Sequence, residues 1–202
     1  MAANSGYCAP YRRRREGKTD YRTRRSYILS GKTRVVIRGS LKNVSAQVVT
    51  AKPQGDEVLA SAHSRELTRS YGWKASRGNL SAAYLTGLLC GMKAKTKGLK
   101  EVIPDIGLHS PTKSARVFAV LKGVSDAGID IPHEEEMLPD DKRIEGEHVV
   151  EYAKSLASNP EEYQAKFSKY LEQKLSPENL PENFAEVKKN IVAAFEGGNK
   201  KT

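Results

Sequence analysis

The order in which apolar patterning changes along residues 34–132 restricts the fold more than any other feature of the sequence. Three short stretches at 34–38, 44–50 and 57–62 have the composition of strands and are separated by brief turn-forming segments. Tight connections of this kind favour an antiparallel meander, because strands joined by short turns pair with each other. The segment 64–78 that follows is rich in Gly, Ser and basic residues, which predicts an irregular connection.

The rest of this region alternates between helical and strand patterns. A helix is expected over 79–98, where an asparagine N-cap precedes apolar residues that recur on one helical face. A serine–proline pair begins a second expected helix at 110–128, and short strands are expected at 101–103 and 129–131. Helices between strands imply parallel pairing through right-handed crossovers. The predicted fold class is therefore α/β, with a mixed sheet in which an antiparallel meander precedes parallel strand-helix units.

Two features of the first expected helix indicate packing rather than chemistry. Gly87 and Gly91 are four residues apart on the apolar face, which favours close approach of a second helix. Cys90 lies on the same apolar helix and is expected to be an inert part of the core.

The remaining residues predict a helical extension. One helix is expected over 147–158, a second from the Asn-Pro-Glu-Glu start signal at 159, and a third marked by apolar residues from Phe184 to Phe195. We expect these helices to pack on the body or on a protein partner. The predicted organisation is a basic N-terminal arm at 1–33, an α/β body at 34–132 and an acidic helical extension at 133–202.

The net charge of +10 at pH 7 is distributed unevenly along the chain. Residues 1–34 hold ten cationic and two acidic residues, and eight of the cationic ones are arginines. Residues 35–132 carry a further excess of seven positive charges, whereas 133–202 have a net charge of −5. We therefore expect a polyanion to contact the first two segments and to avoid the third.

The strongest local feature is the run YRRRREGKTDYRTRR at 11–25, in which ten of fifteen residues are Arg, Lys or Tyr. Guanidinium groups match phosphate oxygens in pairs, and the interleaved tyrosines can stack on bases. A localisation signal or a solvated tail is the alternative, and the aromatic residues argue against it. Because residues 1–30 have little apolar periodicity, we expect an arm that is disordered alone and orders on a partner. The candidate RNA contacts of the arm are Tyr11, Arg12, Arg13, Arg14, Arg15, Lys18, Thr19, Tyr21, Arg22, Arg24 and Arg25.

A second candidate RNA contact lies in the irregular connection before the first expected helix. Tyr71, Trp73, Lys74 and Arg77 stand there among Gly and Ser residues, and an aromatic ring beside a cation suits RNA. Trp73 is equally well explained as a lid over the core, and the sequence leaves this alternative open. The lysines at 93–100 end a helix, where cations are favourable for structural reasons alone.

The sequence contains no complete motif for nucleotide hydrolysis, metal binding or a serine nucleophile. Gly17-Lys18-Thr19 resembles the end of a P-loop, but Arg12 stands where the motif needs a glycine and no strand precedes it. The four histidines lack metal-binding spacing, and there is no GxSxG sequence. No apolar run approaches the roughly 18 residues of a membrane span. Cys8 and Cys90 are too few for a disulfide scaffold, so a reduced, cytosolic setting fits best.

Five sequence blocks, in order, resemble one family. The chain is similar to the archaeal form of the large-subunit ribosomal protein family called L eighteen, whose eukaryotic relative is called L five. The blocks are YRRRREGKTDY at 11–21, GDEVLASAHSREL at 55–67, GNLSAAYLTGLL at 78–89, DIGLHSPTKSARVFAVLKGVSDAGIDIPH at 105–133 and RIEGEHVVEY at 143–152. The tail after about residue 155 matches only loosely.

The resemblance implies binding to 5S rRNA in the central protuberance of the large ribosomal subunit. It also implies contacts with large-subunit rRNA and with neighbouring ribosomal proteins, a cytoplasmic location and a ribonuclease-H-like mixed sheet. By this resemblance, the arm and the segment 71–77 are expected to contact RNA. No cofactor, metal, membrane or small-molecule substrate is expected.

Two alternatives to the ribosomal role differ in the chemistry that they require. Ribonuclease-H-like nucleases hold metal ions with carboxylates, one of them on the first strand, but this chain has arginines at 34 and 38 and no acid there. We therefore expect no catalytic residue. The second alternative, a regulatory RNA-binding module outside the ribosome, remains open.

Overall fold

The fold is built on a four-stranded mixed sheet with the strand order β3-β2-β1-β4. The computed structural model describes residues 6–173 and 175–196. Strands β1 (Arg34–Gly39), β2 (Val44–Lys52) and β3 (Gly55–His63) pair antiparallel, and β4 (Ile103–Asp105) pairs parallel with β1. The expected α/β class and antiparallel meander are confirmed.

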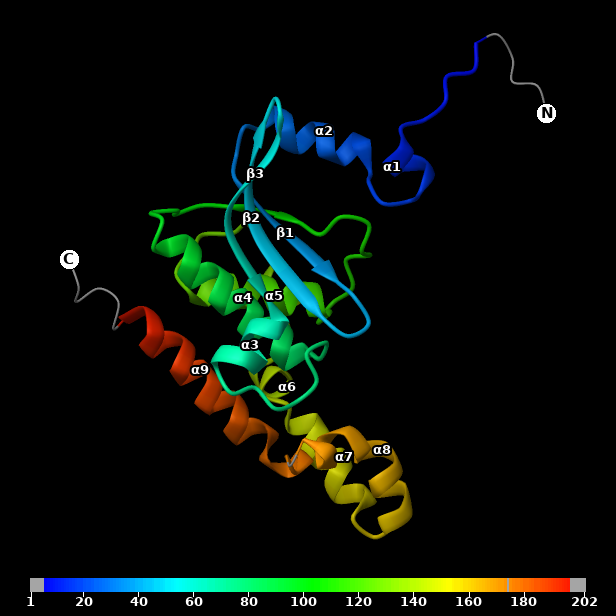
Figure 1. The fold of residues 1–202 in the computed structure, drawn as a ribbon, viewed down its shortest axis with the longest axis vertical. Helices are drawn as coiled ribbons and strands as arrows, with labels where there is room; N and C mark the ends of the chain where they lie inside the picture. Colours follow the sequence, from blue (N-terminus) through cyan, green and yellow to red (C-terminus); the bar gives the residue numbers. More distant parts are fainter. Residues whose placement is uncertain (1–5, 174, 197–202) are drawn as a thin grey trace.

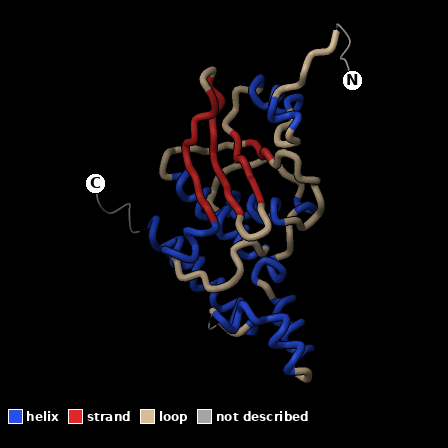
Figure 2. Tube along the Cα trace, turned by 45° about the vertical axis from the view of Figure 1, so that its right-hand side comes forward, coloured by secondary structure: helices blue, strands red, loops and turns tan. Residues whose placement is uncertain are grey.

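Helices cover one face of this sheet. Helices α4 (Leu80–Lys95) and α5 (Arg116–Asp126) lie behind the strands in Figure 1. Val35 and Ile37 of β1 point toward these helices and are almost fully buried, because alternate residues of a strand face the same side. Apart from the N-terminal arm, the other face is free of helices (Figure 2).

The two central helices approach each other through glycines, as the sequence predicted. A Cβ atom added to Gly87 would lie 2.2 Å from the carbonyl oxygen of Val120, and one added to Gly123 would lie 2.2 Å from that of Tyr84. At Gly91 an added Cβ would meet the Ala127 side chain at 2.5 Å. A larger residue at any of these positions would therefore have to separate the helices.

Two expectations about the connections are wrong. Residues 64–70 form helix α3 (Ser64–Ser70) instead of an irregular segment. The backbone N–H of Arg65 donates to the His63 side chain, and Glu66 Oε1 accepts from the His63 N–H, so a capping box starts this helix. Histidine is an uncommon cap and the helix buries only Ser64 and Leu67, which explains the weak sequence signal.

The second central helix starts later than expected. Ser110 and Pro111 lie in an irregular segment, and α5 begins at Arg116 after the positive φ of 57° at Ser114. Arg116 Nη1 donates to the carbonyl oxygens of Ser40 and Gly78, each at 3.0 Å, and holds the helix start against two distant loops. Such long-range contacts leave no local signature.

The parallel part of the sheet is shorter than expected. Strand β4 covers 103–105 in place of 101–103, and in the expected strand 129–131 the structure has a single bridge between Asp130 and Glu101. The likeness to the ribonuclease-H fold therefore stays a prediction.

The C-terminal extension is helical, as predicted, and packs on the body. Its elements are η1 (Glu135–Met137), α6 (Asp141–Glu145), α7 (Glu147–Leu156), α8 (Pro160–Glu172), η2 (Pro177–Asn179) and α9 (Leu180–Glu196). The sequence did not predict α6. Leu180, Phe184, Val187 and Ile191 of α9 are buried in the same hydrophobic cluster as the sheet and its helices. The extension thus shares the core of the body.

The N-terminal arm contains two short helices, α1 (Arg12–Arg15) and α2 (Tyr21–Leu29). They lie beside the turn between β2 and β3, at the opposite end of the molecule from α7 and α8 (Figure 1). Neither helix has a buried residue. Residues 1–5 of the expected arm lie outside the described residues.

Candidate RNA-binding surfaces

The start of α2 is determined by Asp20. Its carboxylate accepts hydrogen bonds from the Arg22 N–H at 2.9 Å and from the Thr23 hydroxyl at 2.7 Å, as an N-cap does. The hydrogen bond from Thr23, followed by that from Arg22, lowers the pKa of Asp20 below its ordinary value. Asp20, an acidic residue within a basic run, therefore starts the helix that carries Arg22, Arg24 and Arg25.

The turn before α2 is closed by the arm's own side chains. Arg13 Nε donates to the Thr19 hydroxyl at 2.9 Å, and Lys18 Nζ lies 2.8 Å from Glu16 Oε2. The rings of Tyr11 and Tyr21 pack with their centroids 5.0 Å apart. The P-loop-like residues are thus part of an exposed turn and do not follow a strand.

Four arginines of the arm point their charge into solvent. Within residues 6–173 and 175–196, the side chains of Arg14, Arg15, Arg22 and Arg25 form no salt bridge or hydrogen bond. All four are exposed. We call these four residues, together with Tyr11, Arg12, Arg13, Lys18, Thr19 and Tyr21, the arm surface. Its free guanidinium forks are suited to phosphate oxygens.

Arg24 was expected among the RNA contacts, but the structure turns it toward the body. Its Nη1 and Nη2 atoms donate to the two carboxylate oxygens of Asp56, at 3.0 and 2.9 Å. Tyr27, one helical turn later, is partly buried on the same side. This bidentate ion pair connects the arm to the start of β3.

Asp56 belongs to a charged network on the open face of the sheet. Its second partner is Arg34, a side chain whose residue is only 2% exposed and whose Nη2 lies 2.5 Å from Asp56 Oδ2. Asp105 lies 3.5 Å from Arg34 Nε and 3.1 Å from Arg38 Nη2. Burial alone would raise the pKa of Asp56, but the hydrogen bonds and charges of Arg24 and Arg34 hold it below the ordinary value.

This network surrounds a cavity of about 260 Å³ between the arm and the sheet. Its walls include Thr23 and Tyr27 from the arm and Val36 and Gln47 from the open face. The arm is therefore docked over the sheet by charge and leaves space below it.

The carboxylates of this network form ion pairs with arginines. Asp56 and Asp105 are both paired with arginines, as described above. The described part of the chain contains no group of three or more His, Cys, Asp or Glu residues placed to hold a metal ion.

Side chains of α9 hold the second candidate RNA contact, the segment 71–77, in place. The Asn183 side chain accepts a hydrogen bond from the Lys74 N–H and donates one to the Gly72 carbonyl oxygen, both at 3.2 Å. Asn190 donates to the Tyr71 carbonyl oxygen at 3.3 Å. Residues far along the chain thus shape the segment 71–77.

Trp73 corrects one expected RNA contact. The residue is 1% exposed, and its indole N–H donates to the Ser76 carbonyl oxygen at 3.1 Å. The open alternative is thereby decided in favour of the core, because a buried ring cannot stack on a base. Lys74 is exposed and Arg77 is partly exposed, so both remain available to a ligand.

Lys74 and Arg77 line a groove of about 1,020 Å³ that the sequence did not reveal. Its lining comes from the turn between β1 and β2, from Thr68 of α3, from the segment 72–77 and from the end of the chain segment that forms α8. We call this site the basic groove, because five of its lining residues are cationic: Lys42, Lys74, Arg77, Lys166 and Lys169. No local pattern signals that α8 meets this loop.

The lysines at the end of α4 have structural partners. Lys93 Nζ lies 2.5 Å from Glu66 Oε2 and 2.9 Å from the Ser61 carbonyl oxygen. Lys95 donates to the Ala127 carbonyl oxygen and Lys97 to that of Leu59. These cations hold strand and helix ends together.

A family model described as ribosomal large subunit proteins 60S L5 and 50S L18 matches residues 5–103 and 93–134. The match spans the arm surface, the sheet and both central helices. Among the described residues, no helix has the length and apolar character needed to cross a membrane.

Proposed function

The chain belongs to the family of large-subunit ribosomal proteins 60S L5 and 50S L18, and from this premise we propose that it binds 5S rRNA and attaches it to large-subunit rRNA in the central protuberance. Membership makes it a structural, non-enzymatic component of the large subunit of the cytoplasmic ribosome. The family also implies rRNA and other ribosomal proteins as its partners.

One observation supports the arm surface as the binding site for 5S rRNA. Arg14, Arg15, Arg22 and Arg25 are exposed and unpaired within the described residues, although carboxylates lie nearby in the same arm. Each guanidinium that neutralises a phosphate releases a condensed counterion, which favours binding at low salt. The tyrosine pair at Tyr11 and Tyr21 adds an aromatic surface next to these charges.

The test measures the affinity of the full chain for 5S rRNA over a range of salt concentrations. The double variant Arg15→Glu/Arg25→Glu reverses two exposed charges that have no intramolecular partner among the described residues. We expect the slope of log K against log salt to flatten by about 1.4 to 1.8, since each of the two lost phosphate contacts removes about 0.7 to 0.9. The control is Lys154→Glu/Lys189→Glu, which changes the net charge equally and lies on neither surface.

Two results would contradict the proposal. If the arm variant kept the wild-type slope, the arm surface would not hold the RNA. If the wild-type chain bound an unrelated structured RNA as tightly as 5S rRNA, and left the large subunit during sedimentation in high salt, the regulatory module would be the better explanation.

A further inference from the structure

We propose that the basic groove is a second RNA-backbone site, which holds an RNA segment other than the one on the arm surface. The proposal rests on the proposed RNA-binding function and extends it to the C-terminal extension. It assigns Lys166 and Lys169 of α8 to the same RNA segment as Lys42, Lys74 and Arg77 of the body.

The charge of the groove supports an anionic ligand. Its fifteen lining residues include five that are cationic and none that is acidic. The four lysines are exposed, so their ammonium groups remain hydrated and available. Cations drawn from three separate segments, with no carboxylate between them, concentrate positive potential in one concave surface.

No described carboxylate neutralises the cations of the groove. Within the described residues, none of the five forms a salt bridge with a carboxylate. By contrast, Lys52, Lys93, Lys113 and Lys122 are each paired with an Asp or Glu. The groove therefore gathers five cations whose charge is not neutralised by any carboxylate of the described residues.

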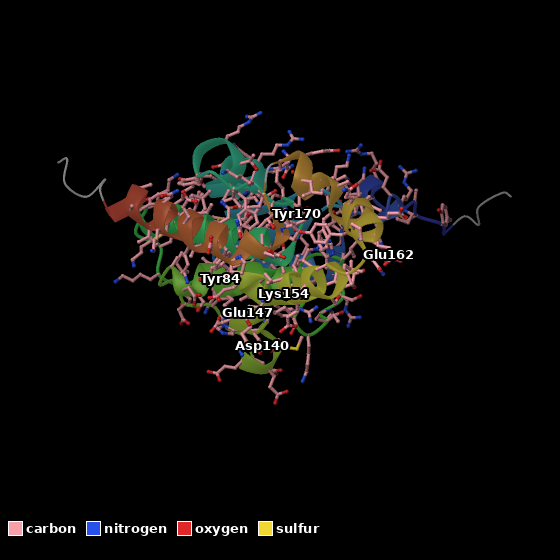
Figure 3. All side chains as sticks on the ribbon, turned by 90° about the horizontal axis from the view of Figure 1, so that it is seen from below. Tyr84, Asp140, Glu147, Lys154, Glu162 and Tyr170 are labelled. Carbon is pink, nitrogen blue, oxygen red and sulfur yellow. The ribbon has the colours of Figure 1, made fainter. Side chains whose placement is uncertain are left out.

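The acidic character of the extension does not extend into the groove. Residues 133–202 have a net charge of −5, which had predicted that RNA would avoid this segment. In Figure 3 the acidic Asp140 and Glu147 lie on one side of the molecule and Tyr170, which lines the groove, lies on the other. The average charge of the extension therefore conceals the two lysines that α8 contributes to a lining without acidic residues.

The location of the groove makes it independent of the arm. The arm lies beside the turn between β2 and β3, whereas α8 lies at the other end of the molecule's longest axis (Figure 1). Two RNA segments can therefore be held at the same time, one at each end. A protein that joins two RNA segments needs this arrangement.

An RNA strand fits the groove better than an acidic protein segment does. Protein interfaces bury an apolar centre with aromatic anchors, but Trp73 is buried within the protein itself. Leu41 is the large hydrophobic residue of the lining that is most exposed, at 98%. The remaining exposed lining is dominated by cationic and small polar residues, which suits a phosphate backbone.

The test compares three full-length proteins in binding to 5S rRNA and to a large-subunit rRNA fragment. They are the wild type, Lys166→Glu/Lys169→Glu and the control Lys154→Glu/Lys189→Glu, and both variants change exposed residues of the extension. With one of the two RNAs, we expect the groove variant to bind on the order of tenfold more weakly at 0.1 M salt and its salt slope to flatten by about 1.5. The control should match the wild type with both RNAs. The neutral variant Lys166→Gln/Lys169→Gln should give a smaller loss in the same direction.

The outcomes separate this inference from the proposed function. If the wild type binds neither RNA, the proposed function fails. If the wild type binds but the groove variant equals the control with both RNAs, the groove is not an RNA site and the inference fails alone. Loss of binding to an acidic peptide, with RNA binding unchanged, would assign the groove to a protein and also overturn the inference.

Discussion

At the scale of single residues, Asp56 has a larger role than its exposed position at the start of β3 indicates. It pairs with Arg24 from the arm and with the buried Arg34. In Asp56→Asn, the guanidinium of Arg34 keeps only the more distant Asp105. We expect a loss of about 1 to 3 kcal/mol in the free energy of unfolding, below the 3 to 5 of a fully buried pair. Urea denaturation at neutral pH measures it.

The pH dependence of stability checks the cause of this loss. The folded pKa of Asp56 is depressed below its ordinary value of 3.8, so its contribution is present above about pH 4 and disappears as the pH falls through the folded pKa. The difference between wild type and Asp56→Asn should therefore shrink in acid. The control Glu57→Gln breaks the exposed pair with Lys52 and should cost less than about 1 kcal/mol. An equal loss in both variants would contradict the role of Arg34.

Several residue roles could not be predicted from the sequence because they depend on partners that are far away along the chain. The basic run at 11–25 predicted a cationic arm, but nothing local separates Arg24, which faces Asp56, from Arg25, which faces solvent. Cys90 was predictable as core, since it lies on an apolar helix, and burial raises the pKa of its thiol to about 12. Trp73 was undecided because an indole serves equally well as a lid and as a stacking surface.

At the scale of elements, the packing of α4 on α5 gives a sharp prediction. In Gly87→Ala the new methyl group would meet the Val120 backbone at 2.2 Å, and a backbone atom cannot rotate away. Alanine would gain about 1 kcal/mol of helix propensity, but forced separation of the helices should cost about 1 to 3 kcal/mol or more. We expect a net fall in the thermal midpoint, measured by circular dichroism.

A glycine with space around it provides the control for this prediction. An added methyl group at Gly39 would lie 3.8 Å from the nearest Arg116 atom, which is ordinary contact. Gly39→Ala should therefore leave the midpoint nearly unchanged. If Gly87→Ala were as stable as the wild type, the two helices could not be as tightly packed as the structure has them.

Elements were predictable from the sequence where their signals were local. The three meander strands and α4 have clear patterning, turns or caps, and they appeared within a few residues of their expected bounds. Helix α5 began six residues after Ser110, because Arg116 is held by loops 38 and 76 residues away in sequence. The basic groove was missed for the same reason, since α8 and the turn between β1 and β2 meet only in the folded chain.

At the scale of the whole molecule, the arm and the basic groove act from opposite ends, so their contributions should be separable. Neither α1 nor α2 buries a residue, and a variant lacking residues 1–30 should therefore keep a folded body. It should lose most of its affinity for 5S rRNA and show a flatter salt slope. Adding Lys166→Glu/Lys169→Glu to the truncation should further weaken the salt-dependent binding of the RNA that the groove holds. Because the sites share no partner, the two losses should add in log K. Filter binding of all four proteins over a salt series measures this, and unchanged affinity of the truncated chain would show that the arm is not the grip on RNA.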